Sequence, residues 1–126
     1  MSRILVVDDD HAIRESVRIA LSSVGIEVIG ADCGERAIEL FARNRFDGVI
    51  VDLMMPGIDG IETIQALRAI EPGLPAVIIS GALMRDPSAP DFMRLGTRLH
   101  GVVRLAKPFT LADLLRTVHN CVAVAA

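Results

Sequence analysis

The sequence predicts an α/β protein whose core is a doubly wound, five-stranded parallel sheet. Short apolar runs alternate with amphipathic stretches along the whole chain, and each run ends close to a polar residue. The runs Ile4–Val7 and Ala76–Ile79 are continuously aliphatic, which is typical of strands that are covered on both faces. We therefore expect helices to pack against both sides of the sheet.

The first half of the chain contains three of the expected strands and two of the expected helices. The strands are Ile4–Val7, Glu27–Ala31 and Gly48–Val51, and the helices are His11–Ser23 and Gly34–Arg43. Asp10 stands directly before the first helix and is its expected N-cap. The helical spacing of apolar residues turns Val17, Leu21 and Val24 toward the core.

The second half repeats this alternation. Asp59 and Glu62 match a capping box, which begins a helix that turns Ile70 inward. Thr110 is the expected cap of the last helix. The expected strands here are Ala76–Ile79 and Gly101–Ala106.

The length and composition are those of one soluble domain. The 126 residues carry a net charge of -3 and are 52% hydrophobic, so a core is available while generic binding to nucleic acid or to an anionic membrane is disfavoured. No apolar stretch approaches the roughly 18–20 residues of a membrane span, and no signal peptide is recognisable. Cys33 and Cys121 lack metal-ligand spacing and are expected to be buried, reduced thiols of a cytoplasmic protein. We expect residues 1–126 to form a single domain without an effector domain.

Polar residues that follow the expected strands carry the functional signal. Three aspartates follow the first strand, and one polar residue follows each of three later strands: Asp8, Asp9, Asp10, Asp52, Ser80 and Lys107. Because the carboxyl ends of parallel strands meet at one edge of a sheet, these side chains are expected to converge in one crevice. Two carboxylates about 4 Å apart repel by roughly 4 kcal/mol at an effective dielectric constant of about 20, and a single lysine cannot offset three of them. An all-oxygen cluster of this kind favours Mg²⁺.

In this order and strand context, the residues resemble the receiver domain of two-component response regulators. The matching elements are Asp8-Asp9 after ILVV, Asp52 in VDLMMPGIDG, Ser80 in VIISG and Lys107 in LAKPF. The resemblance covers essentially the whole chain and implies a flavodoxin-like (βα)₅ fold with strand order 2-1-3-4-5. It also implies a stand-alone, CheY-like signalling phosphoacceptor rather than an enzyme.

The resemblance further implies how the acidic residues act. Asp52 would accept a phosphoryl group from a sensor histidine kinase or a histidine phosphotransfer protein, in an Mg²⁺-dependent reaction. Asp9, Asp52 and the backbone carbonyl of Met54 would bind the metal ion. Asp8 would bind it directly or through water.

The resemblance assigns the response to phosphorylation to the later strands. Lys107 would pair with Asp52 before phosphorylation and with a phosphoryl oxygen afterwards, and Ser80 would bind a second phosphoryl oxygen. The surface formed by the fourth helix, fifth strand and fifth helix would then bind a downstream protein, or the chain would pass the phosphoryl group on in a phosphorelay. The family also suggests a cis peptide bond between Lys107 and Pro108.

Three features depart from the family pattern. Arg104 stands where the family generally carries an aromatic residue that turns inward, so it is either an exposed charge or a contact to a partner. Residues 81–90 lengthen the segment after the fourth strand and predict an extended loop, followed by a short helix over Asp91–Leu99. Met54 and Ala82 are apolar where polar side chains could orient water, so we expect slow hydrolysis of the acyl phosphate.

Two other functions remain open on the sequence alone. Arg104 and the long loop would suit a pseudo-receiver, a module that binds partners without being phosphorylated. Asp8 and Asp10 have the DxD spacing of haloacid-dehalogenase-like phosphatases, in which Asp8 would be the nucleophile. Against the phosphatase, His11-Ala12 does not continue that motif, the chain has no cap insertion, and no acidic pair follows Lys107.

Overall fold

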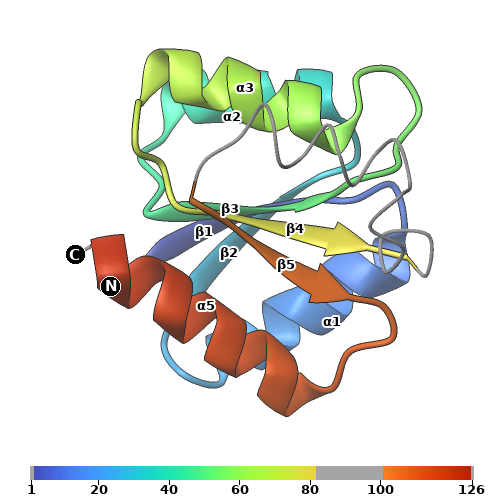
Figure 1. The fold of residues 1–126 in the computed structure, drawn as a ribbon, viewed down its shortest axis with the longest axis vertical. Coiled ribbons are helices and arrows are strands. Elements are labelled where there is room, and N and C mark those ends of the chain that lie inside the picture. Colours follow the sequence, from blue (N-terminus) through green and yellow to red (C-terminus); the bar gives the residue numbers. More distant parts are fainter. Residues whose placement is uncertain (1, 82–100, 126) are drawn as a thin grey trace.

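The computed structural model describes residues 2–81 and 101–125, which form a five-stranded sheet with helices on both faces (Figure 1). The strands are β1 (Arg3–Val7), β2 (Glu27–Ala31), β3 (Gly48–Asp52), β4 (Ala76–Ser80) and β5 (Val102–Ala106). The described helices are α1 (His11–Ser22), α2 (Gly34–Arg43), α3 (Gly60–Ile70) and α5 (Leu111–Ala125). All strand pairs are parallel and their order is β2-β1-β3-β4-β5, which confirms the expected doubly wound sheet. The helix expected over Asp91–Leu99 lies outside the described residues, as does most of the loop before it.

Side chains that cap the helices explain where the helices begin. The Asp10 carboxylate accepts a hydrogen bond from a backbone N–H in the first turn of α1. Asp59 and Glu62 form the expected capping box, in which each side chain accepts from the other residue's backbone N–H, at 2.9 and 3.1 Å. The Thr110 hydroxyl accepts from the backbone N–H of Asp113 at 3.0 Å, at the start of α5. These local signals are the reason that the helix starts could be predicted.

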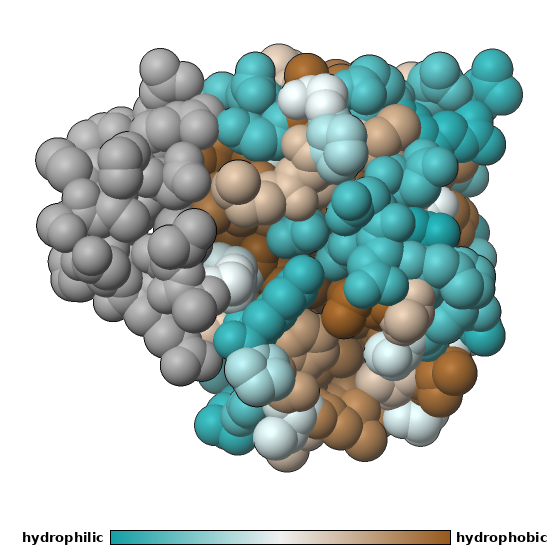
Figure 2. Space-filling view, turned by 90° about the vertical axis from the view of Figure 1, so that its right-hand side faces the viewer, coloured by the Kyte–Doolittle hydropathy of each residue, from teal (hydrophilic) through white to brown (hydrophobic). Residues whose placement is uncertain are grey.

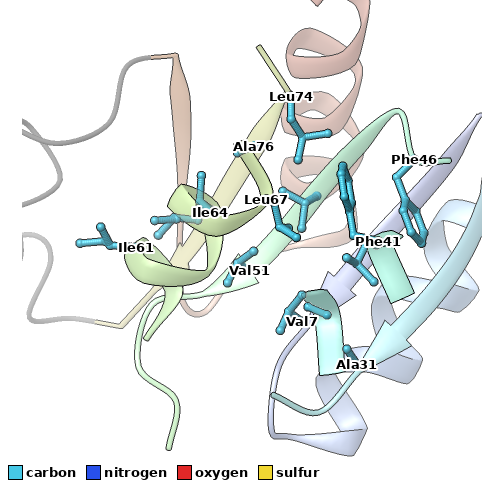
Figure 3. Close-up of a cluster of buried hydrophobic side chains, with 14 of the residues drawn as sticks. Val7, Ala31, Phe41, Phe46, Val51, Ile61, Ile64, Leu67, Leu74 and Ala76 are labelled. Carbon is cyan, nitrogen blue, oxygen red and sulfur yellow. The ribbon is translucent and has the colours of Figure 1, made fainter. Parts of the chain in front are cut away.

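The sheet separates two apolar layers. Helices α2 and α3 cover one face, and α1 and α5 cover the other (Figure 1). The layer beneath α2 and α3, drawn in Figure 3, includes Val7, Phe41, Phe46, Val51, Ile61, Ile64, Leu67 and Leu74. The opposite layer includes Ile4, Val6, Val17, Leu21, Ile50, Val77, Ile79 and Leu114. Burial on both faces accounts for the continuous aliphatic runs in the sequence.

Two apolar residues that were expected to face the core are exposed. Val24 is 56% exposed and Ile70 is 54% exposed. Val24 lies beyond the end of α1, and Ile70 is the last residue of α3. Helical periodicity identifies the buried face of a helix but not the point at which the covering layer ends, so this part of the prediction is wrong.

The two cysteines are free and half-buried, rather than buried as expected. The Cys33 sulfur accepts a hydrogen bond from the backbone N–H of Arg36 at 3.4 Å and thereby caps α2. The Cys121 thiol donates to the carbonyl of Ala76 at 3.7 Å. Within residues 2–81 and 101–125, none of the helices has the length and apolar composition that a bilayer crossing requires.

Candidate functional site

The carboxyl ends of four parallel strands bring the predicted residues to one end of the sheet. Asp8 and Asp9 follow β1, Asp52 and Ser80 end β3 and β4, and Lys107 follows β5. The backbone N–H of Lys107 donates to the Ser80 carbonyl at 2.7 Å and joins the last two of these strand ends. Figure 2 looks onto this end of the molecule, where hydrophilic residues cover much of the described surface.

Three carboxylates form a compact cluster at the centre of this end. One oxygen from each of Asp8, Asp9 and Asp52 lies within 4.8 Å of the others. Asp8 is fully buried and Asp52 is 6% exposed, whereas Asp9 is exposed to solvent. The cluster therefore has two buried carboxylates and a third at its solvent side.

Lys107 supplies positive charge to both buried carboxylates. Its Nζ atom lies 3.7 Å from Asp52 Oδ2 and 3.9 Å from Asp8 Oδ2. The pairing with Asp52 agrees with the arrangement expected before phosphorylation, and the contact with Asp8 had not been predicted. The peptide bond between Lys107 and Pro108 is cis, as the family suggested.

Burial changes the proton affinity of both buried acids. It raises the pKa of Asp8 to about 6, and the charge of Asp52 adds to this rise, while a backbone N–H of Asp10 and the Lys107 ammonium oppose it. Burial also raises the pKa of Asp52, again against the attraction of Lys107. Without a further cation, the cluster therefore resists carrying its full negative charge.

The cluster fits a divalent metal ion. Among the described residues, the buried Asp8 Oδ2 atom has no hydrogen-bond partner, and the nearest cation is the Lys107 ammonium at 3.9 Å. Three carboxylates near one ammonium leave an excess of negative charge in a low-dielectric setting. Oxygen ligands partly open to solvent are the surroundings that Mg²⁺ prefers, since this ion usually keeps several waters.

The remaining predicted residues occupy different surroundings. Ser80 is buried, with 3% exposure, at the end of β4. Arg104 is exposed on β5, opposite Ile78 of β4, a position that fits both expected roles, an exposed charge and a contact to a partner. The Met54 side chain is 61% exposed, while its backbone N–H lowers the pKa of Asp52. Ala82 lies outside the described residues.

Two residues that shape the site were not singled out from the sequence. A side chain at Gly60 would collide with the backbone carbonyl of Asp52, so glycine lets α3 approach the end of β3 closely. Glycine is a poor helix former, so its presence as the first residue of a capped helix is a sequence signal that could have identified Gly60. The Arg14 guanidinium donates to the backbone carbonyl of Asp8 at 2.6 Å, a contact with no sequence signature.

Known proteins share both the sequence and the fold. The profile of the response regulator receiver domain matches residues 4–119. Response regulator MprA of Mycobacterium sp. (strain KMS) is 42% identical over 113 residues, or 90% of this chain and 47% of the relative. Response regulator MprA of Mycobacterium leprae (strain TN) is 39% identical over 92% of this chain and 49% of the relative. The chain thus spans about half the length of these curated relatives.

Solved structures lead to the same family. The Vibrio cholerae chemotaxis protein CheY4 superposes with a TM-score of 0.84 at 29% identity, over 96% of this chain and 98% of that protein. A response regulator receiver protein from Sinorhizobium medicae WSM419 superposes with a TM-score of 0.85 at 26% identity, over 99% and 97% of the two chains. The sequence profile, the relatives and the shared fold agree, and the chain belongs to the response regulator receiver domain family.

Proposed function

We propose that the chain accepts a phosphoryl group on Asp52 and signals through the resulting change in its surface. The observation that carries this proposal is the charge arrangement around Asp52. Its carboxylate is nearly buried, lies 3.7 Å from the Lys107 ammonium, and belongs to a three-carboxylate cluster suited to a divalent ion. A carboxylate is a competent phosphoryl acceptor when positive charge offsets its repulsion of the incoming oxygens.

The transfer needs a donor with a labile phosphoryl group, and we propose a phosphohistidine. A bond forms between an Asp52 carboxylate oxygen and phosphorus, the bond from phosphorus to the imidazole nitrogen breaks, and its electron pair returns to that nitrogen. When held by Asp8, Asp9, Asp52 and the Met54 carbonyl, Mg²⁺ would neutralise charge on the phosphoryl oxygens. The Lys107 ammonium would lie beside the group as it arrives and donate to one of its oxygens.

The response follows from the charge that phosphorylation adds. A phosphoryl group brings extra negative charge and strong acceptor oxygens to a position next to Lys107 and close to the end of β4. Hydrogen bonds from Ser80 and Lys107 to the phosphoryl oxygens would then stabilise a second arrangement of the β4 and β5 ends. The downstream partner would be a protein that binds the surface including β5 and α5, and neither nucleic acid nor a membrane is part of the proposal.

The proposed partners are a sensor histidine kinase or a histidine phosphotransfer protein in the cytoplasm. In this role the chain is a phosphoacceptor that assists its own phosphorylation and dephosphorylation, rather than an enzyme acting on other molecules. The free thiols of Cys33 and Cys121 are compatible with such a reducing compartment.

Intact-protein mass spectrometry after incubation with acetyl phosphate tests the proposal. The wild-type protein should gain one phosphoryl group when Mg²⁺ is present and much less when it is chelated, and Asp52→Asn should gain none. Asp10→Asn is the matched control, because asparagine also caps a helix and the acidic cluster stays intact. Absence of any gain in the wild type would favour a pseudo-receiver. A gain that persists in Asp52→Asn but disappears in Asp8→Asn would favour the phosphatase interpretation.

A further inference from the structure

The turn that carries Asp8 and Asp9 is held by hydrogen bonds on several sides. The backbone N–H of Asp8 donates to the Ala31 carbonyl of β2 at 3.1 Å. The Asp8 Oδ1 atom accepts from the backbone N–H of Asp10 at 2.9 Å. These bonds fix the amide and one carboxylate oxygen of Asp8, and the carbonyl is its remaining backbone polar group.

Arg14 holds that carbonyl. It lies in the second turn of α1, and its Nη1 donates to the Asp8 carbonyl at 2.6 Å. The Arg14 residue is half-buried, and a hydrogen bond from a charged donor is stronger than one between neutral groups. Because the Asp8 carbonyl belongs to the peptide unit that leads into Asp9, this bond fixes the direction in which the chain enters Asp9.

The path of the Arg14 side chain depends on a glycine in β2. A Cβ atom at Gly30 would lie 3.3 Å from Arg14 Cδ, so a larger residue would press on the side chain. Arg14 also borders an open hollow of about 340 Å³ that is lined by Gly30, Ala31, Asp32 and Arg36. Strand β2 therefore provides the space through which Arg14 reaches the Asp8 carbonyl.

We propose that Arg14 is a positioning residue for the metal site, acting through the Asp8 carbonyl to orient the Asp8 and Asp9 carboxylates. This inference rests on the proposed function, since it concerns the same Mg²⁺ site. It predicts that removal of the Arg14 side chain weakens Mg²⁺ binding, whereas a purely electrostatic effect would strengthen it. A cation near a metal site repels the metal, so removal of a mere surface charge would tighten Mg²⁺ binding. Removal of a positioning residue weakens it, because partners of metal ligands typically contribute about 10- to 100-fold in affinity.

The first test is Mg²⁺ affinity by titration calorimetry. Arg14→Met keeps the aliphatic stem but loses the donor, and should bind Mg²⁺ about tenfold more weakly than the wild type. Arg14→Lys keeps a charged donor and should recover most of this loss. The control is Arg18→Ala, one turn further along α1, where the guanidinium pairs with Glu15 at 2.6 Å; its affinity should be unchanged or slightly higher. Equal or tighter binding by Arg14→Met would overturn the proposal.

Substitutions in β2 test the same contact while Arg14 itself is unchanged. Gly30→Val suits a strand but crowds the Arg14 side chain, and should weaken Mg²⁺ binding in the same direction. The control is Ile29→Val, the adjacent residue of β2, whose side chain points to the opposite face of the sheet. Loss of affinity in both β2 variants, or in neither, would contradict the proposed path.

Hydrogen exchange of the metal-free protein separates this inference from the proposed function. The backbone amides of Asp8 and Asp10, which donate to the Ala31 carbonyl and to Asp8 Oδ1, should exchange faster in Arg14→Met than in Arg18→Ala, while amides of β3 and β4 are unchanged. This measurement needs neither Mg²⁺ nor phosphorylation, so it tests Arg14 even if the wild type binds no metal. Equal exchange of these amides in the two variants would show that Arg14 does not hold the turn.

Discussion

On the β1–β3 side of the site two of the three carboxylates, Asp8 and Asp52, are buried, whereas the charged groups on the β4–β5 side are partly or fully open to solvent. The side chains of Asp8 and Asp52 are 0% and 9% exposed, while that of Lys107 is 32% exposed. Arg104, three residues before Lys107, is also exposed. The acidic side is fixed by packing and hydrogen bonds, so it can present a metal site before any ligand arrives. The opposite side carries Ser80 and Lys107, the two residues that would respond to phosphorylation in the proposed function.

The largest difference between the two sides should appear in metal binding. Asp9→Asn removes a carboxylate from the acidic cluster and should weaken Mg²⁺ binding by about 100-fold. Residues that only support metal ligands already contribute up to about 100-fold in affinity, so loss of a proposed ligand should cost at least as much. Titration calorimetry measures the affinity. Arg104→Ala, on the other side, serves as the comparison and should leave it nearly unchanged. Similar losses in both variants would remove the distinction between the sides.

The pH dependence of stability tests the buried charge on the acidic side. The pKa of Asp8 is raised to about 6, so the native state binds this proton more tightly than the unfolded chain does. The free energy of unfolding of the metal-free protein should therefore fall as pH rises, by about 1 kcal/mol between pH 5 and pH 7 from this group. Urea unfolding at several pH values measures it.

Asp8→Asn provides the control for that measurement. The variant cannot lose the buried proton, so its stability should lack this fall, and it should exceed the wild type in stability at pH 7 without metal. If the wild type and Asp8→Asn show the same pH dependence, Asp8 is not the group responsible.

The lifetime of the phosphorylated state should depend on Met54, at the solvent-facing margin of the site. Met54→Asn places a polar side chain where it can orient water toward the acyl phosphate, and should speed loss of the phosphoryl group severalfold. Loss is timed by intact mass after removal of the donor. Met54→Leu keeps an apolar side chain and is expected to match the wild type, so a similar acceleration in both variants would argue against the role of polarity.

The smallest expected effect is the change in the free energy of unfolding when Arg104 is substituted. Because this residue is exposed, Arg104→Ala should change the free energy of unfolding by about 0.5 kcal/mol or less. The next residue is Leu105, which is 6% exposed, and Leu105→Ala should cost about 2–5 kcal/mol. Urea unfolding compares the two. A large loss in Arg104→Ala would mean that this side of the site is packed as tightly as the acidic side.

The sequence predicted the strands to within one residue at each end, since their composition and bounding turns are local properties. It also predicted that Asp8, Asp9, Asp52 and Lys107 converge, because parallel strands place their carboxyl ends at one edge of the sheet. The exposure of Ile70 was not predictable in this way, because it depends on where the neighbouring layer ends.

Contacts between residues that are far apart along the chain could not be predicted from the sequence either. Lys107 lies between Asp8 and Asp52 rather than beside one of them, which depends on the relative placement of three strand ends. The bond from Arg14 to the Asp8 carbonyl depends on the space left by Gly30 in a neighbouring strand. Neither residue type nor spacing along the chain encodes such distances.

Chemical trapping of the modified residue tests the central claim most directly. Borohydride reduces an aspartyl phosphate to homoserine, releasing phosphate, so the acceptor can be located by peptide mass spectrometry after acetyl phosphate and Mg²⁺ treatment. We predict homoserine at position 52 and at no other aspartate. Homoserine at Asp8 or Asp9, or unmodified aspartate throughout a wild-type protein that binds Mg²⁺, would contradict it.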